Sequence, residues 1–244
     1  MKKHAVVTGG GSGIGAAVAK RLLADGLRVT LMGRSLERLR STQAALGEVA
    51  VQACDVGDEA SVAAAFAAVG DVDVLVNNAG QVETAPLAKT SLEVWQRLLN
   101  VNLTGSFLCS RAVLPGMLAR RDGRIVNVAS TAALKGYAYV AAYCAAKHGV
   151  LGLTRALALE VAAKGVTVNA VCPGYTETDI VAGAIANIVA KTGRTASQAR
   201  AELAKANPQG RLIQPEEVAD TVAWLVRSGG VNGQAIAVDG GETM

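Results

Sequence analysis

The stretch that decides the fold is Ala5-Val6-Val7-Thr8-Gly9-Gly10-Gly11-Ser12-Gly13-Ile14-Gly15. Its leading apolar residues predict a short buried strand, and apolar residues at positions 14, 18 and 22 predict one face of a following helix. Glycines at such a turn let the backbone approach a ligand closely, and the N-terminus of the helix offers free N–H groups to a phosphate. The stretch therefore predicts a nucleotide-binding strand–turn–helix unit. Because the glycine spacing is not G-x-G-x-x-G, a purely structural turn is the alternative.

The second predicted strand, residues 28–32, leads into Gly33-Arg34-Ser35. A unit that binds NAD places an acidic residue near this position to hydrogen-bond the adenosine ribose. Here Gly33 leaves space, and the forked guanidinium of Arg34 can pair with a 2′-phosphate. We therefore expect NADP(H) to be preferred and NAD(H) to be possible; the alternative is that Arg34 only solvates a loop.

The remainder of the chain alternates strands with helices. Further strands are predicted at residues 49–54, 72–76, 124–129, 166–172 and 235–238, and helical patterns lie between them. This alternation predicts an α/β fold: a single Rossmann-type domain over residues 1–244, with a doubly wound parallel sheet and helices on both faces. Residues 179–212 are helical without a strand of their own, and we expect them to form a substrate lid.

Three local patterns carry more specific expectations. Thr90-x-x-Glu93 predicts a capping box that opens a helix with residues 92, 95 and 99 on one face. Asn102 interrupts this helical region, so it is either a structural kink or a polar group in a site. Small residues at positions 142, 145, 146 and 149 allow another helix to approach closely, and we expect a subunit contact there.

The chemistry is expected at Tyr143-Cys144-Ala145-Ala146-Lys147. Residues four apart on a helix share one face, so the phenol and the ammonium lie together. A phenol titrates near pH 10 in water, and a neighbouring cation would stabilise its phenolate. Tyr143 and Lys147 are therefore candidates for proton transfer, although this short motif also occurs by chance.

Composition excludes several classes of protein. The net charge is +4 and aromatic residues make up 3% of the chain, with no dense basic run, which argues against nucleic acid as a partner. No apolar stretch reaches the roughly 20 residues that span a bilayer, and no signal region opens the chain, so we expect a cytoplasmic protein. The spacing of the four cysteines fits neither a metal site nor a disulfide framework, so we expect reduced thiols in the core and no metal.

Taken together, the motifs resemble one family, the classical short-chain dehydrogenases/reductases, over essentially the whole chain. The residues that carry the resemblance occur in the family's order and spacing: Thr8-Gly9-x-x-x-Gly13-Ile14-Gly15, Asn78-Ala79-Gly80, Asn102, Ser130, Tyr143-x-x-x-Lys147 and Pro173-Gly174. A binding protein that keeps the fold without the chemistry is a remote alternative, because it would be expected to lose Ser130, Tyr143 or Lys147.

The resemblance implies a division of labour around a nicotinamide ring. Tyr143 would be the general acid in carbonyl reduction; Lys147, together with the positive charge of the oxidised nicotinamide, would lower its pKa, and Lys147 would hold the nicotinamide ribose. Ser130 would hydrogen-bond the substrate oxygen, and Asn102 would hold a water that links Lys147 to solvent. The implied cofactor contacts are Gly9, Ser12, Gly13, Ile14, Gly15, Arg34, Asp55, Val56, Asn78, Ala79, Gly80, Tyr143, Lys147, Pro173, Gly174, Thr176 and Thr178. Ser12 stands where some NADPH-preferring members carry a basic residue, which leaves Arg34 alone to bind the phosphate.

Within the family, residues 123–172 are similar to β-ketoacyl reductases. This similarity implies reduction of a 3-oxoacyl thioester by a homotetramer, on a substrate linked to coenzyme A or to a carrier protein. Arg121 and Lys164 would dock an acidic carrier protein, and lid cations at positions 191, 194, 200 and 205 could meet coenzyme A phosphates. An NAD-dependent alcohol or 3-hydroxyacyl-CoA dehydrogenase that runs oxidatively is the alternative. Residues 131–140 and 175–212 would shape the substrate pocket.

Overall fold

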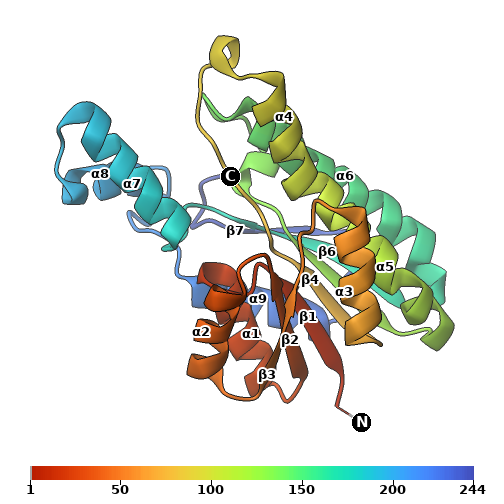
Figure 1. Ribbon diagram of the computed structural model, residues 1–244. Helices are drawn as coiled ribbons and strands as arrows, with labels where there is room; N and C mark the ends of the chain where they lie inside the picture. The colour runs from red at the N-terminus through yellow and green to blue at the C-terminus, as the bar shows by residue number, and fades with distance from the viewer. Residues whose placement is uncertain (1) are drawn as a thin grey trace.

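A seven-stranded parallel sheet forms the centre of the computed structural model, which describes residues 2–244 (Figure 1). The strand order is β3-β2-β1-β4-β5-β6-β7, and every neighbouring pair is parallel. The strands are β1 (His4–Thr8), β2 (Arg28–Gly33), β3 (Val49–Ala53), β4 (Val74–Asn77), β5 (Gly123–Val128), β6 (Val166–Pro173) and β7 (Ala235–Val238). The predicted doubly wound sheet is confirmed; the first residue of the predicted domain lies outside the described residues.

Helices cover both faces of this sheet (Figure 1). They are α1 (Gly13–Ala24), α2 (Leu36–Leu46), α3 (Glu59–Val69), α4 (Leu92–Leu99), α5 (Gly105–Arg120), α6 (Ala141–Val161), α7 (Asp179–Thr192), α8 (Ala196–Ala204) and α9 (Pro215–Arg227). Successive strand residues point to opposite faces, so Val7 packs in one core with α1, α2 and α9, whereas Val6 packs in another with α3, α5 and α6.

The chain changes direction of winding between β1 and β4, which are neighbours in the sheet but not in the sequence. In an open parallel sheet a ligand binds at the carboxyl ends of the strands beside such a switch point. The glycine turn follows β1, and Asn78-Ala79-Gly80 follows β4. The fold therefore brings the two predicted cofactor motifs to one edge.

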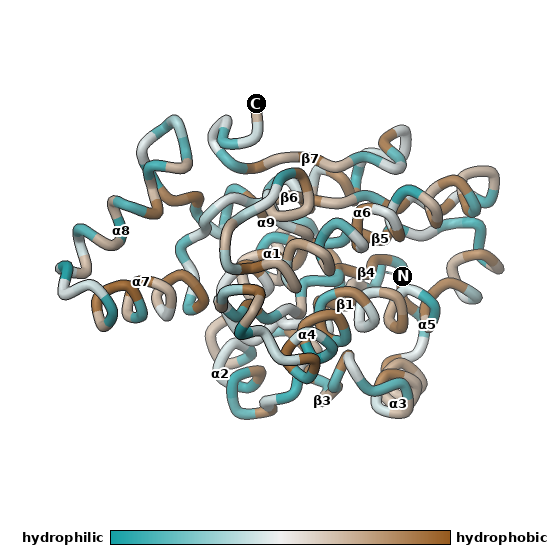
Figure 2. The backbone as a smooth tube through the Cα atoms, turned by 90° about the horizontal axis from the view of Figure 1, so that it is seen from above, coloured by the Kyte–Doolittle hydropathy of each residue, from teal (hydrophilic) through white to brown (hydrophobic). Residues whose placement is uncertain are grey.

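Helices α7 and α8 project to one side of the sheet (Figures 1 and 2). They share a small apolar cluster of their own, in which Val181, Ala204 and Leu212 are buried. Arg200 on α8 also pairs with Glu177 in the segment that follows β6. The two helices therefore stand over the carboxyl edge of the sheet rather than in its main cores.

The predicted capping box at Thr90 is wrong. Ser91 is the N-cap of α4, and its hydroxyl accepts from the backbone N–H of Val94 at 3.2 Å, whereas Thr90 donates to the carbonyl of Pro86. The predicted apolar face also differs: Leu98 is buried, while the Leu92 side chain is exposed. Trp95 and Leu99 of the predicted face are half-buried, so the prediction fails only at Leu92, in the first turn.

The face of small residues on α6 is occupied within the same chain. A Cβ at Gly149 would lie 2.7 Å from a methyl carbon of Leu103, and Ala142 and Ala146 are buried. At Gly149 the close approach therefore comes from the segment that precedes α5, whereas Ala145 is half-buried and the subunit contact at this face stays a prediction. The cysteines are free thiols as expected, but Cys144 on α6 is only half-buried.

Asn102 lies in a π-helical segment, Asn100–Thr104, that joins α4 to α5. Such a bulge adds one residue to a helical turn and occurs frequently at functional sites. The interruption expected from the sequence is thus a local widening of the helix, with the Asn102 side chain buried.

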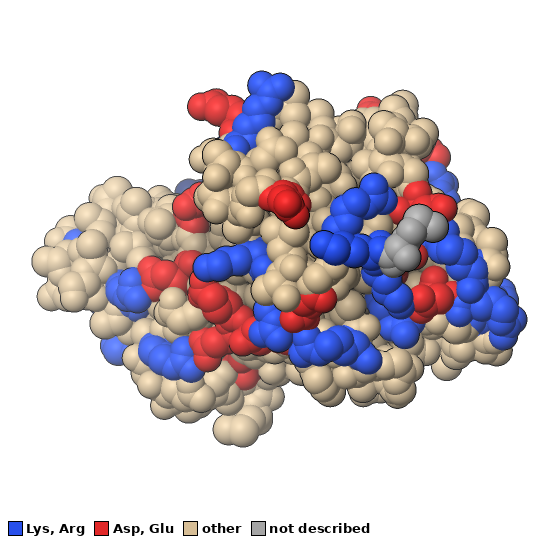
Figure 3. Space-filling view, turned by 90° about the horizontal axis from the view of Figure 1, so that it is seen from below, with Lys and Arg blue, Asp and Glu red and all other residues tan. Residues whose placement is uncertain are grey.

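Charges are mixed on the side of the molecule where β1 begins. Figure 3 shows Lys and Arg interspersed there with Asp and Glu, and the ion pairs include Lys3 with Asp122 at 2.7 Å. Within residues 2–244, no helix combines the length and hydrophobicity needed to cross a membrane.

A buried histidine at the start of β1 ties this strand to β2 and to the segment that precedes β4. His4 is 3% exposed; its Nδ1 donates to the carbonyl of Asp71 at 2.7 Å, and its Nε2 accepts from the hydroxyl of Thr30 at 2.8 Å. Burial lowers the pKa of the His4 imidazole, and the positive charge of Arg28 lowers it further. The hydrogen bond to the carbonyl of Asp71 acts in the opposite direction and raises this pKa.

This shift predicts a loss of stability in mild acid. Because the unfolded chain takes up the proton on His4 at a higher pH than the folded chain does, the free energy of unfolding should fall as the pH drops below 6.5. Urea denaturation at pH 7.5 and 5.5 checks this for the wild type and for His4→Gln. The variant should lose less stability over that interval; equal losses would assign the effect to other groups.

Candidate active site

A groove of about 720 Å³ runs along the carboxyl edge of the sheet on the β1–β3 side. The predicted cofactor residues that line it share this edge; they are Gly9, Ser12, Gly13, Ile14, Arg34, Asp55, Val56, Asn78, Ala79, Gly80 and Thr178. The groove is long enough to pass from the loop after β2 to the switch point between β1 and β4. Its position is the one expected for a dinucleotide.

The glycine turn fits a pyrophosphate. Gly9 and Gly13 have φ angles of +65° and +51°, which other residues rarely adopt, and a Cβ at Gly15 would lie 2.3 Å from the carbonyl oxygen of Gly9. The N-cap Ser12 makes no side-chain hydrogen bond to α1, and the first turn of α1 contains no acidic residue. The free N–H groups at this helix end are therefore available to an anion.

Two guanidinium groups line the end of the groove beyond β2. Arg34 follows β2, and Arg38 reaches the same space from the first turn of α2. The role of Arg34 in binding the phosphate stays a prediction, and the Ser35 cap starts α2 so that Arg38, which was not predicted from the sequence, also lines the groove. Because Arg34 precedes the Ser35 cap and lies outside the helix, no helical spacing in the sequence indicated that Arg38 shares its groove.

A second cleft of about 480 Å³ adjoins the groove, and Ile14, Asn78, Gly80 and Thr178 line both. It brings together Asn102, Ser130, Tyr143 and Lys147, which come from three separate segments, since Tyr143 and Lys147 share α6. Pro173, Gly174 and Thr176 line it as well. Apart from Gly15, which is packed beneath the turn, every predicted site residue lines one of the two spaces.

Lys147 is buried on α6 beside Tyr143. Its Nζ lies 5.6 Å from the centre of the Tyr143 ring and donates to the carbonyl of Val128 at 2.9 Å. Burial lowers the pKa of Lys147 to about 8. An ammonium with a pKa this close to neutrality can exchange a proton under ordinary conditions.

Burial also raises the pKa of Tyr143 to about 12, although a hydrogen bond to the hydroxyl of Ser130 acts in the opposite direction. In the chain alone, desolvation of the phenolate outweighs this hydrogen bond; the lowering that the resemblance implies involves Lys147 together with the charge of the bound nicotinamide. A cationic ring bound beside the phenol would add the missing favourable charge.

Asn102 clamps the segment that follows β4. Its Nδ2 donates to the carbonyls of Gln81 and Leu98, both at 2.8 Å, and its Oδ1 accepts from the N–H of Gln81 at 3.2 Å. A Cβ at Gly80 would lie 2.7 Å from Asn102 Oδ1 and 3.7 Å from Lys147 Nζ. Because both amide protons are used, Asn102 can contribute only acceptor atoms to the expected water link.

The predicted docking cations lie elsewhere. Arg121 and Lys164 precede β5 and β6, so they lie at the amino edge of the sheet, opposite the cleft. In the projecting helices, Arg200 pairs with Glu177, and Lys205 and Arg194 pair with Glu202. Lys191 lines the cleft. On a single chain, Lys191 is therefore the predicted cation best placed to meet a substrate.

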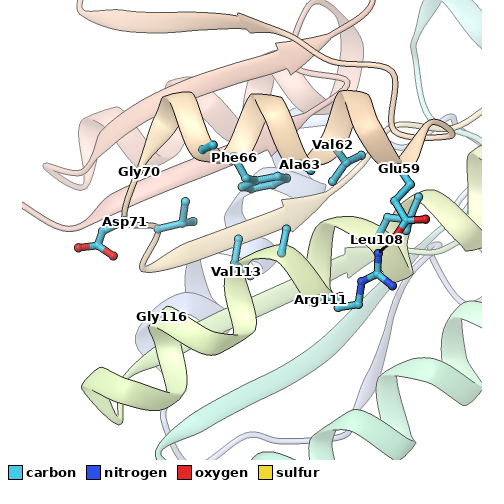
Figure 4. Close-up of a pocket in the computed structure, with 13 residues that line it drawn as sticks. Glu59, Val62, Ala63, Phe66, Gly70, Asp71, Leu108, Arg111, Val113 and Gly116 are labelled. Atoms are coloured by element: carbon cyan, nitrogen blue, oxygen red, sulfur yellow. Dashed lines mark hydrogen bonds and ion pairs between the residues drawn. The ribbon is translucent and has the colours of Figure 1, made fainter.

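A separate depression of about 430 Å³ lies between α3 and α5 (Figure 4). Small and apolar residues such as Ala63 and Phe66 form its walls, and the ion pair of Glu59 with Arg111 stands at one end. Within residues 2–244, none of the predicted site residues lines it.

The model of the short chain dehydrogenase family matches residues 3–189. This chain belongs to that family. It is therefore an oxidoreductase, as the site residues predict, and its groove fits the nicotinamide cofactor of the family.

Individual members of the family resemble the chain over nearly its whole length. A provisionally named ketoacyl reductase of Streptomyces coelicolor is 44% identical over 97% of this chain and 95% of the relative. The cis-4-hydroxycyclohexanecarboxylate dehydrogenase of Sinomonas cyclohexanicum is 43% identical over 99% of this chain and 97% of the relative. The crystal structure of a variant actinorhodin polyketide ketoreductase with NADPH is 42% identical, covers 99% of this chain and 97% of its own, and superposes with a TM-score of 0.93.

The close packing of Gly15 predicts a specific effect of an added methyl group. Gly15→Ala should destabilise the fold by about 1–3 kcal/mol and weaken cofactor binding, because the turn must move away from α1. Thermal unfolding and calorimetric titration with NADPH measure the two effects. Gly183→Ala on α7 is the control, since nothing lies within 4 Å of its added carbon. Unchanged binding in Gly15→Ala would contradict the assignment of the turn.

Proposed function

We propose that this short-chain dehydrogenase reduces a 3-oxoacyl thioester to the 3-hydroxyacyl thioester and prefers NADPH. The observation that carries the proposal is the cleft that unites Ser130, Tyr143 and Lys147 at the end of the cofactor groove. The names of the two ketoreductase relatives support the direction and the class of substrate.

In this proposal the chain's own groups handle the substrate oxygen. When bound, the nicotinamide supplies the hydride. The hydroxyl of Ser130 hydrogen-bonds the carbonyl oxygen, and the phenol of Tyr143 gives that oxygen its proton as the bond order falls. The ammonium of Lys147, 5.6 Å from the centre of the Tyr143 ring, then stabilises the phenolate that remains.

The projecting helices complete the cleft as a lid. Val181 and Ile188 on α7 and Leu203 on α8 line it with apolar surface, and Lys191 lies among the lining residues on the same side. Such a wall suits an acyl chain, and the ammonium suits a phosphate of a coenzyme A or carrier-linked substrate. These features support a thioester.

Turnover tests the proposal directly. Acetoacetyl-CoA should be reduced with NADPH, and Tyr143→Phe should lower kcat by at least about 100-fold, because the proton donor is lost while the ring remains. The measurement is the initial rate of NADPH oxidation. Tyr139→Phe is a matched control, since that ring is 65% exposed.

Other outcomes discriminate among the alternatives. If neither cofactor is oxidised, the thioester is wrong and other ketones become candidates. If the chain instead oxidises 3-hydroxybutyryl-CoA with NAD more rapidly, the oxidative alternative is correct. Full activity of Tyr143→Phe would remove Tyr143 from the chemistry.

The arginine pair predicts the basis of cofactor preference. Arg34→Ala should raise KM for NADPH by about 10–100-fold and leave KM for NADH nearly unchanged, because it loses a charge-assisted contact to the 2′-phosphate. Arg38→Ala should shift KM in the same direction by less. Arg40→Ala, exposed on α2 and outside the groove lining, should change neither constant. Parallel changes for both cofactors would contradict a role in phosphate binding.

We also propose a homotetramer, which exposed apolar side chains support. Leu92, Leu159 and Trp224 are 68%, 84% and 43% exposed. Light scattering should give a mass near four times 24.8 kDa. A mass of one or two chains would contradict the tetramer.

A further inference from the structure

The last residues of the chain turn back toward the cleft. After β7, the carboxylate of Asp239 accepts from the backbone N–H and the hydroxyl of Thr243, at 3.1 and 2.6 Å. Gly240 has a φ of +64°, and a Cβ there would lie 2.0 Å from Asn207 Oδ1, so glycine is required for this turn. The turn directs Glu242 inward, where its side chain is 1% exposed.

The buried carboxylate of Glu242 holds two residues of the segment that follows the catalytic serine. Lys135 Nζ lies 3.2 Å from Glu242 Oε1 and donates to the Glu242 carbonyl at 3.2 Å. The hydroxyl of Tyr137 also donates to the carboxylate, and its oxygen lies 2.7 Å from Thr131 Oγ1. Because a carboxylate only accepts, Thr131 must donate to Tyr137. A chain of hydrogen bonds thus links Glu242 to the neighbour of Ser130.

Tyr137 is part of an aromatic wall. Its ring meets that of Tyr175 edge to face, with centres 6.5 Å apart, and both rings line the substrate cleft together with Tyr143. The whole chain has only eight aromatic side chains, namely two Trp, four Tyr and two Phe. Three of these eight line the substrate cleft, so aromatic residues are enriched there. A Cβ at Gly174, which lines the same cleft, would lie 3.0 Å from Glu242 Oε2, so the carboxylate stands directly behind the wall.

We propose that Glu242 is a positioning residue: it fixes Tyr137 so that Tyr137 and Tyr175 form a rigid wall, which favours 3-oxo substrates with a flat ring on the ketone carbon. Aromatic rings pack well against one another in edge-to-face or offset geometry, and a fixed partner loses less entropy on binding. The inference rests on the proposed ketone reduction and adds the feature that selects among ketones.

A matched pair of substrates separates this role from a structural one. Ethyl benzoylacetate and ethyl acetoacetate are both 3-oxo esters and differ by a phenyl or a methyl group on the ketone. With NADPH, Glu242→Ala and Tyr137→Phe should each raise KM for the phenyl ester about fivefold more than KM for the methyl ester, while any change in kcat should be the same for the two esters.

The two substitutions should also act as one. Since Glu242 works through the Tyr137 hydroxyl, the double variant should be no worse than either single variant for the phenyl ester. Glu242→Gln, which keeps an acceptor oxygen, should retain part of the discrimination. Glu48→Ala, on the exposed surface, should behave as the wild type. Equal changes for both esters, or additive effects, would overturn the inference.

A binding measurement keeps the inference testable without turnover. If the wild type reduces neither ester, the proposed function fails for these ketones. The role of Glu242 is then tested by calorimetric titration of ethyl benzoylacetate into the enzyme in the presence of NADP⁺. The same two variants should weaken this binding about fivefold. Equal affinity in the wild type and the variants, or no binding to the wild type, would overturn the role of Glu242.

Discussion

A short set of hydrogen bonds between the ends of β1 and β4 is the constraint on which the rest of the site depends. The hydroxyl of Thr8 accepts from the N–H groups of Asn78 and Ala79 at 3.0 and 3.1 Å, and Asn78 Nδ2 donates to the carbonyls of Thr8 and Gly9. These bonds hold the glycine turn against the strand at the switch point. The cofactor groove and the substrate cleft both begin there.

Beyond this point the protein concentrates buried polar groups along the centre of the sheet. Asn77 Nδ2 donates to Asn127 Oδ1 at 2.8 Å, and Asn127 in turn donates to the hydroxyl of Thr154 on α6. Lys147 lies on the same helix and donates to the carbonyl of Val128. Buried polar groups are costly unless they are paired, so these bonds specify how α6 sits on the sheet. The position of α6 then sets where the ammonium of Lys147 and the phenol of Tyr143 stand.

Local rules predicted most of the fold, whereas most residues of the proposed site came from the resemblance to the family. The periodicity of apolar residues correctly predicted the order of strands and helices. The spacing of Tyr143 and Lys147 correctly predicted that the two side chains share one face of a helix. The errors lie at the cap of α4, where a choice of one residue mattered, and at Leu92, which the predicted apolar face included but which is exposed. Neither is decided by the propensity of a single segment.

The sequence by itself determined the α/β class, the glycine turn and the residues that could exchange a proton, because each follows from spacing within one element. Only the tertiary structure decided that Arg38 joins Arg34 in one groove, and that burial raises the pKa of Tyr143. It also decided that Glu242 lies behind a wall formed by Tyr137, more than 100 residues earlier in the chain. Contacts between distant residues and the desolvation of charges depend on how elements pack, and no local pattern in the chain records that packing.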